Sequence, residues 1–141
     1  MKIIYRATTQ DVPFTCWEKS ILFGTDYVIK FISDTKKSGD PRYCYVTDSS
    51  TYPVRQQIFS IIETTTPTQI SNQVKLDISR SWKYTVFEVT PAYIASLTNW
   101  TQFSESGLTT VEIGLVKVLD ANPTEKEVYT GNQSSFKEYG G

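Results

Sequence analysis

The chain has 141 residues and a formal net charge of −1, and 39% of its residues are hydrophobic while 21% are charged. This length fits a single domain with its own core, and the composition excludes a disordered chain. The longest run of positive charge is Lys36-Lys37, which excludes the clustered basic surface typical of nucleic-acid-binding proteins.

The N-terminal sequence bears on where the protein is made. A charged residue, Arg6, follows the first apolar residues at once, and no stretch approaches the roughly 18 apolar residues of a membrane-spanning helix. We therefore expect synthesis in the cytoplasm without a secretory signal, and no membrane partner.

The first half of the chain predicts five short strands, because apolar residues alternate with polar ones between clusters of turn residues. The predicted strands are residues 2–7, 12–17, 27–33, 42–47 and 55–63. Pro13 cannot donate a hydrogen bond to a neighbouring strand, so the second strand is expected at an edge. The connection 20–25 carries apolar residues that we expect to be exposed, and residues 34–41 form a solvated turn by composition.

The second half predicts three more strands and one short helix. The strands are expected at 72–78, 81–89 and 111–119, with 127–130 as a candidate for a last one. Thr90 as a cap and Pro91 at the first helical position predict one or two helical turns over 90–97, followed by an exposed loop to residue 110. We expect a β-sandwich domain over 1–130 and a polar C-terminal tail over 131–141.

The two longest β runs, 81–89 and 111–119, carry the clearest strand signal. Successive side chains of a strand point to opposite faces, and the apolar faces of these runs are Trp82, Tyr84 and Val86 in the first and Val111, Ile113 and Leu115 in the second. We interpret both as central strands facing the core. The predicted fold class is all-β: a single antiparallel β-sandwich, immunoglobulin-like or jelly-roll-like, of about eight strands with at most one short helix.

Few residues of the chain are suited to catalysis. It has no histidine, the commonest general base and metal ligand, and no glycine-rich phosphate-binding pattern. Paired carboxylates remain an option for acid–base chemistry, and the candidates in or beside strands are Glu63, Asp77, Glu88 and Glu112. Acidic side chains are mostly exposed, so we expect each of these on a solvated face. The sequence predicts no enzyme, no cofactor and no metal site.

The chain has two cysteines, too few for a disulfide framework. Cys16 lies in an apolar segment and Cys44 between two tyrosines. We expect both as free thiols packed like small hydrophobic residues, with a disulfide between them as the alternative.

Aromatic residues are the better candidates for a binding surface. Exposed rings stack on sugars or anchor protein interfaces, where tyrosine and tryptophan are enriched. The candidates for interaction are Tyr43, Tyr45, Tyr52, Trp100, Phe103, Phe136 and Tyr139. The alternative is that the rings only cap the ends of the core.

The two long β runs also carry a resemblance. A segment such as 74–78, then Trp82-x-Tyr84-x-Val86-Phe87-Glu88, a variable loop, and Val111-Glu112-x-Gly114-Leu115 with Val118 resembles small virion structural proteins of tailed bacteriophages, especially crAss-like phages. It is more distantly similar to the N-terminal β-sandwich domain of phage baseplate upper proteins. The similarity covers roughly residues 1–120. Such sequences often place a glycine ahead of the aromatic strand, where this chain has Arg80-Ser81.

The resemblance implies a non-enzymatic protein of the virion, assembled in the host cytoplasm. It would bind other virion proteins as a head decoration, a fibre-attachment protein or a neck or tail ring component, as a homo-oligomer or in symmetric copies. The alternative is a carbohydrate- or receptor-binding module that uses Tyr43, Tyr45, Tyr52 or Trp100.

Overall fold

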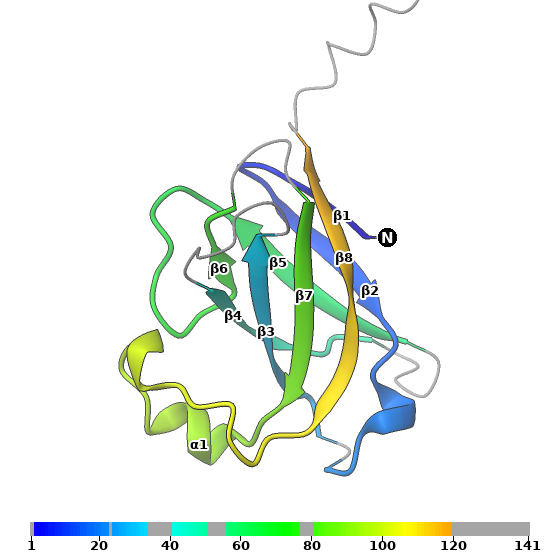
Figure 1. Cartoon of the computed structure of the whole chain (residues 1–141), viewed down its shortest axis with the longest axis vertical. Helices are drawn as coiled ribbons and strands as arrows, with labels where there is room; N and C mark the ends of the chain where they lie inside the picture. Colours follow the sequence, from blue (N-terminus) through cyan, green and yellow to red (C-terminus); the bar gives the residue numbers. More distant parts are fainter. Residues whose placement is uncertain (1, 23, 34–40, 51–55, 77–80, 120–141) are drawn as a thin grey trace, which may run out of the picture.

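Eight strands arranged in two sheets form the framework of the described part of the protein, as Figure 1 shows for the computed structural model. The structure describes residues 2–22, 24–33, 41–50, 56–76 and 81–119. The predicted loop 34–40, the candidate strand 127–130 and the tail 131–141 lie outside the described residues.

The larger sheet has five strands in the order β1-β8-β7-β3-β4. Their bounds are Lys2–Tyr5 for β1, Asp26–Ser33 for β3, Arg42–Thr47 for β4, Ser81–Glu88 for β7 and Thr110–Leu119 for β8. The two runs with the clearest strand signal are therefore an adjacent antiparallel pair inside this sheet, as predicted. Neighbouring strands are antiparallel except β1, which runs parallel to β8.

The smaller sheet has three strands in the order β2-β5-β6. Their bounds are Thr9–Phe14 for β2, Gln57–Glu63 for β5 and Gln73–Val74 for β6. β2 is antiparallel to β5, while β6 is parallel to it. The prediction of purely antiparallel sheets is therefore wrong for two strand pairs. In the β1–β8 pair, the parallel arrangement arises because the turn after β1 leads the chain into the other sheet. β1 therefore pairs with β8 and not with β2.

The second strand differs from its prediction at both ends. It begins at Thr9, earlier than predicted. The polar residues at its start resemble a break in the sequence, but they belong to an edge strand, where polar side chains can occupy the exposed face. It ends at Phe14, and Trp17–Lys19 form a 3-10 helix. Pro13 lies in this edge strand, as its missing N–H group predicts.

The predicted helix is present as α1 (Pro91–Ala95). Thr90 is its N-cap, and the Thr90 hydroxyl accepts a hydrogen bond of 3.2 Å from the Tyr93 N–H. A second 3-10 helix, Trp100–Gln102, lies in the following loop. In the described ranges, no helix is both long and apolar enough to cross a membrane.

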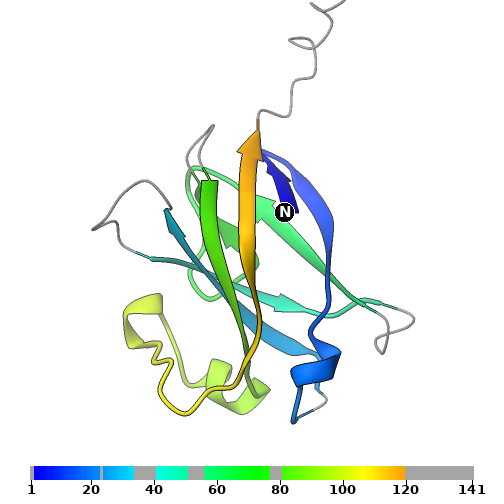
Figure 2. The same ribbon diagram turned by 45° about the vertical axis from the view of Figure 1, so that its right-hand side comes forward.

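Side chains from both sheets contribute to one cluster of buried apolar residues. The ring of Phe14 in β2 meets Tyr84 in β7 edge-on at a centroid distance of 5.4 Å, and Tyr27 in β3 lies 5.1 Å from Phe59 in β5. Figures 1 and 2 show β2 and β5 crossing obliquely behind β7 and β8. Trp82 and Tyr84 belong to this cluster, as predicted.

Both cysteines are free and buried, which confirms their prediction as small hydrophobic residues. Burial raises the pKa of Cys16 to about 12, with a further contribution from the nearby Glu112. The thiol is therefore neutral at physiological pH and a poor nucleophile.

The inward face of β8 is the opposite of the predicted one along most of the strand. Ile113 and Leu115 are 59% and 41% exposed, while Val116 and Val118 are buried. The reason is a bulge, because Val86 pairs with residue 112 and Phe87 with residue 110. The extra residue in β8 shifts the alternation by one position, and this exchanges its two faces.

Candidate functional site

A second group of packed side chains lies on the outer face of the larger sheet. α1 and the loop after it cover part of this face, and Val28, Val89 and Ile94 are buried beneath them. Figures 1 and 2 show this covering segment beside the lower ends of β3 and β7. The segment brings the aromatic residues of the 98–110 loop against β4.

Three of the predicted interaction residues meet there. Tyr43 of β4 stacks on Trp100 with ring centroids 5.4 Å apart and an angle of 29° between the planes. Phe103 lies 5.0 Å from Tyr43 and 5.6 Å from Trp100. These three rings therefore pack on the outer face of a sheet. They do not cap the ends of the core, which was the alternative.

A shared carboxylate holds the covering loop to the sheet. Glu105 accepts hydrogen bonds from the Lys30 ammonium group at 2.6 Å and from the Tyr43 hydroxyl at 3.4 Å. Burial, followed by the nearby Glu105, raises the pKa of Tyr43. The phenol therefore stays protonated and acts as a hydrogen-bond donor.

The remaining aromatic candidates are not part of this trio. Tyr45 packs against the same cluster, but its hydroxyl donates to Asp26 at 2.6 Å and its ring lines a different hollow, beside Ile70 and Asn72. Tyr52, Phe136 and Tyr139 lie outside the described residues.

A cleft of about 280 Å³ opens beside the stacked rings, between β4, β6 and the loop. The side chains that give it its chemical character are Arg42, Tyr43, Gln69, Gln73, Lys75 and Trp100. Its described lining contains two cationic residues and no acidic one. This cleft combines aromatic walls with hydrogen-bond donors, which is the arrangement of a small-ligand site.

Two carboxylates that we expected on solvated faces, Glu63 and Glu88, are instead buried, and a third, Glu112, is largely shielded from solvent. Glu63 is 3% exposed, Glu88 is 2% exposed, and the Glu112 side chain is 13% exposed. Asp77, the fourth candidate, lies outside the described residues. Strand alternation could have predicted the burial of two of them. Glu88 is an even number of residues from Trp82, and Glu63 is an even number from Phe59, so each glutamate points to the same face as a core aromatic residue.

Two of these carboxylates hold loops in place. Glu63 accepts hydrogen bonds of 2.8 Å from the N–H groups of Ala7 and Leu76. Glu88 accepts from the Ser20 hydroxyl and from the N–H groups of Ile21 and Leu22. Each carboxylate thus supplies acceptors to backbone donors that have no strand partner.

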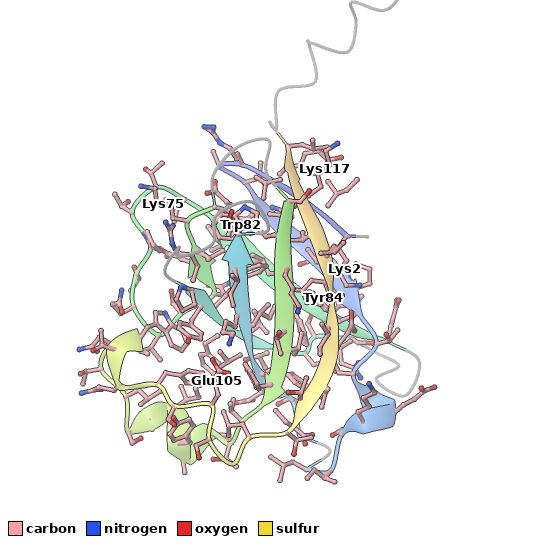
Figure 3. All side chains as sticks on the ribbon, in the orientation of Figure 1. Lys2, Lys75, Trp82, Tyr84, Glu105 and Lys117 are labelled. Atoms are coloured by element: carbon pink, nitrogen blue, oxygen red, sulfur yellow. The ribbon has the colours of Figure 1, made fainter. Side chains whose placement is uncertain are left out.

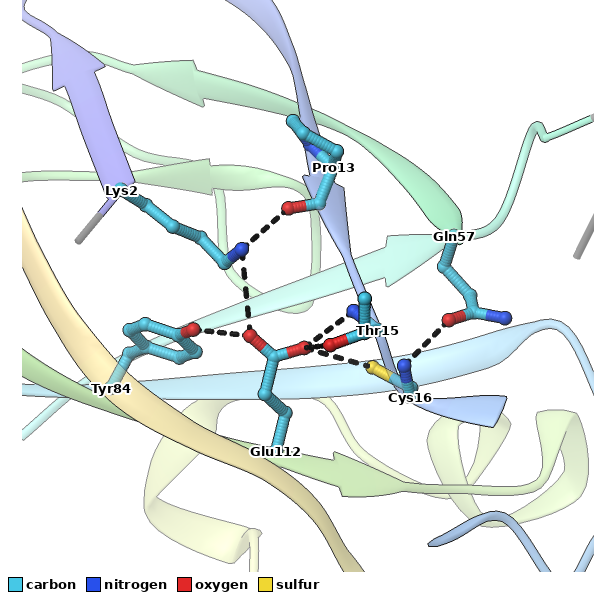
Figure 4. A network of polar contacts seen from close by, with 7 residues as sticks. All are labelled: Lys2, Pro13, Thr15, Cys16, Gln57, Tyr84 and Glu112. Atoms are coloured by element: carbon cyan, nitrogen blue, oxygen red, sulfur yellow. Dashed lines mark hydrogen bonds and ion pairs between the residues drawn. The ribbon is translucent and has the colours of Figure 1, made fainter. Parts of the chain in front are cut away.

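Glu112 is the centre of a network that joins both sheets (Figure 4). It accepts from the Tyr84 hydroxyl and from the Thr15 N–H at 2.5 Å, and the Lys2 ammonium group lies 3.5 Å away. Lys2 also donates to the Pro13 carbonyl at 2.7 Å. Glu63, Glu88 and Glu112 share no hydrogen-bond partner in the contacts above. Their geometry fits structural roles, and in the described ranges no group of three or more His, Cys, Asp and Glu residues could hold a metal ion.

Gly114 is needed for this network because the Tyr84 ring lies across it. A Cβ atom at residue 114 would lie 2.7 Å from the Tyr84 hydroxyl oxygen and 2.8 Å from its ring carbons. We expect Gly114→Ala to lower the free energy of unfolding by about 1–3 kcal/mol, as overpacking in cores does. Urea denaturation measures this change. In the Tyr84→Leu background the same substitution should cost clearly less, and an equal cost in both backgrounds would contradict the proposed clash.

None of the described residues covers the other half of the larger sheet's outer face. Ile113 and Leu115 of β8 lie there beside Ile3 and Tyr5 of β1, and the latter two are 45% and 39% exposed. Lys83 and Lys117 flank them on the same face. We call these six residues the apolar face. Sequence alternation assigned Ile113 and Leu115 to the core, so the apolar face was missed.

The connection between β2 and β3 exposes apolar side chains, as predicted. Ile21 and Leu22 are 67% and 51% exposed, although their N–H groups are held by Glu88. This short segment is a second exposed apolar feature and serves below as a comparison.

Comparison with known proteins returned no match. No family model matches this chain, and neither a curated protein nor a solved structure matches it. The function is therefore argued from the surfaces described above.

Proposed function

We propose that this protein is a non-enzymatic structural subunit of a tailed-phage virion that binds other virion proteins. It would act as a head decoration, a fibre-attachment protein or a neck or tail ring component. The observation that carries this proposal is the apolar face on β1, β7 and β8. The resemblance of the two long β runs to phage virion proteins supplies the biological setting.

The two sheets pack, in this proposal, as a single β-sandwich. Support comes from the Phe14–Tyr84 and Tyr27–Phe59 ring contacts and from the Glu112 network, which all join one sheet to the other. The strand order β8-β7-β3-β4, opposite a sheet in which β2 pairs with β5, favours the immunoglobulin-like alternative over the jelly roll.

The apolar face has the features of a docking surface. α1 and its loop cover the outer face over β3 and β4, whereas the four large apolar side chains over β1 and β8 are 39–59% exposed. A cluster of large apolar side chains on a sheet exposes surface that water solvates poorly, and such patches mark interaction sites.

The charges of this face indicate what covers it. Lys83 and Lys117 contribute two positive charges, and none of the residues that define the face is acidic. Two copies of the same face would bring like charges together, so we assign the contact to a different, acidic and apolar surface of a neighbouring virion protein.

Co-sedimentation with the phage particles whose genome encodes the chain tests this proposal. We expect the wild-type protein to bind, and the double variant Ile113→Ser/Leu115→Ser to bind at least about tenfold more weakly, because two buried aliphatic contacts are lost. The matched control is Ile21→Ser/Leu22→Ser, which removes two equally exposed aliphatic side chains elsewhere.

Several outcomes would contradict the proposal. Absence of wild-type binding to the particles would remove its basis. Loss of binding in the control but not in the Ile113/Leu115 variant would place the contact on the β2–β3 connection. If the purified chain alone forms oligomers that the Ile113/Leu115 variant abolishes, the partner of this face is a second copy of the chain.

A further inference from the structure

We propose that the cleft beside Tyr43 and Trp100 binds a carboxylate-bearing sugar residue. This site is distinct from the apolar face, since its lining residues come from β4, β6 and the loops around them. A ligand site in this cleft therefore does not depend on the proposed assembly role.

The hydrogen bonds of the two glutamines show what the cleft offers to a ligand. The Gln69 side-chain oxygen accepts from the Trp100 N–H at 2.8 Å, and the Gln73 side-chain oxygen accepts from the Thr68 N–H at 2.9 Å. A backbone N–H is a donor only, so these bonds fix which end of each amide is the oxygen. Within the described ranges neither NH₂ group donates a hydrogen bond, so each is available to a ligand.

The cationic residues add to these donors. The Arg42 guanidinium group uses Nη1 to donate to the Lys75 carbonyl at 2.8 Å and retains further N–H groups. The Lys75 side chain is exposed, and within the described part of the chain its ammonium group has no ion-pair partner. A ligand of this cleft must therefore be rich in acceptors, and a negative charge on it would be favoured.

The aromatic walls distinguish a sugar from a simple anion. Tyr43 and Trp100 form a rigid apolar wall, because they stack on each other and Phe103 packs against both, tilted to Tyr43 and edge-on to Trp100. The C–H groups of a pyranose ring pack against such rings, whereas a small inorganic anion gains nothing from them.

The size of the cleft limits the ligand to about one sugar ring. Its volume of about 280 Å³ lies just below the range of roughly 300–1,000 Å³ found for ligand pockets. The chemistry points to a terminal or branching acidic sugar of a surface glycan, with the ring against the aromatic wall and the carboxylate toward Lys75 and Arg42.

The test uses matched probes that differ only in charge. The ¹H–¹⁵N spectrum of the purified chain is titrated with methyl glucuronoside and with methyl glucoside, and a methyl sialoside serves as a second acidic sugar. We expect the amide signals of Trp100 and Gln69 to shift saturably, with at least one acidic glycoside binding about tenfold more tightly than the neutral one, because charge-assisted hydrogen bonds are the stronger kind.

Two substitutions separate the site from general effects. Lys75→Met preserves most of the side-chain length at an exposed position and should abolish the preference for the acidic probe. Lys117→Met is the matched control, because Figure 3 shows Lys117 on β8 at the side of the molecule opposite Lys75. It should leave both affinities unchanged. Raising the salt concentration should weaken only binding of the acidic probe.

Other outcomes would overturn the inference. The site is not a sugar site if neither acidic glycoside binds at millimolar concentrations, or if acetate binds as tightly and identifies a simple anion site. Equal binding of acetyl-Glu-Glu-amide would identify an acidic peptide as the ligand. If neither the glucuronoside nor the sialoside binds the wild type more tightly than the glucoside, the role assigned to Lys75 is removed.

Discussion

Replacing Trp82 by alanine should lower the free energy of unfolding by about 3–5 kcal/mol, as truncation of a large buried aromatic side chain does. Trp82 is 2% exposed and lies in β7 between Ser33 of β3 and Val116 of β8. Domains of this kind have a total stability of only about 5–15 kcal/mol, so the variant would lose a large part of it. Urea denaturation followed by circular dichroism measures the difference.

Trp82→Phe is the informative comparison for this prediction. It keeps an aromatic ring in the core and removes an indole N–H that is buried without an acceptor in the described structure. Part of the lost packing is then offset by removing an unsatisfied donor. We expect a cost of about 1 kcal/mol, well below that of alanine. A Trp82→Ala variant with nearly wild-type stability would show that this ring does not support the core.

Removing the carboxylate of Glu88 should have a comparably large effect. Glu88→Ala removes the acceptor that holds the N–H groups of Ile21 and Leu22, together with one hydrogen bond of the Ser20 hydroxyl. An unsatisfied buried donor costs about 1–3 kcal/mol, and we expect a total loss of about 3–5 kcal/mol because water can reach part of this connection. Denaturation gives the global loss, and hydrogen exchange at residues 21 and 22 reports on the connection itself.

Two further variants show whether the charge and position of Glu88 matter. Glu88→Gln keeps one carbonyl oxygen for the backbone donors but presents an NH₂ group in place of the other oxygen, so an intermediate loss of about 1–2 kcal/mol is expected. Glu18→Ala removes an exposed carboxylate and should change stability by less than about 0.5 kcal/mol. Equal effects of Glu88→Ala and Glu18→Ala would contradict the anchoring role.

The comparison between sequence and structure is clearest in the strands. The bounds predicted for β4 match those observed, and β7 differs by one residue at its end. Both strands have obvious turn residues on at least one side, β4 is a short run rich in aromatic and β-branched residues, and β7 alternates over most of its length, so local information is sufficient. The cap and proline of α1 are likewise local signals, and they located the only α-helix in the described ranges.

The site was only partly predictable. Tyr43, Trp100 and Phe103 were identified as interaction candidates because exposed aromatic rings stack on sugars and anchor protein interfaces, but nothing in the sequence placed the 98–110 loop against β4. Gln69, Gln73 and Lys75 were missed altogether. They are polar residues near a short strand, and such residues gain significance only when the fold brings them beside an aromatic wall.

The sequence by itself determined the all-β class, the buried thiols and the position of the capped helix, because alternation, hydrophobicity and capping act between near neighbours in the chain. Only the tertiary structure decided which face of β8 is inward, since one bulged residue opposite β7 reverses its alternation. It also decided the burial of Glu63 and Glu88 and the partial burial of Glu112, because the donors that make such a carboxylate stable come from residues 13 to 97 positions away in the chain. Register and long-range hydrogen bonds depend on distant partners, and residue type alone does not specify them.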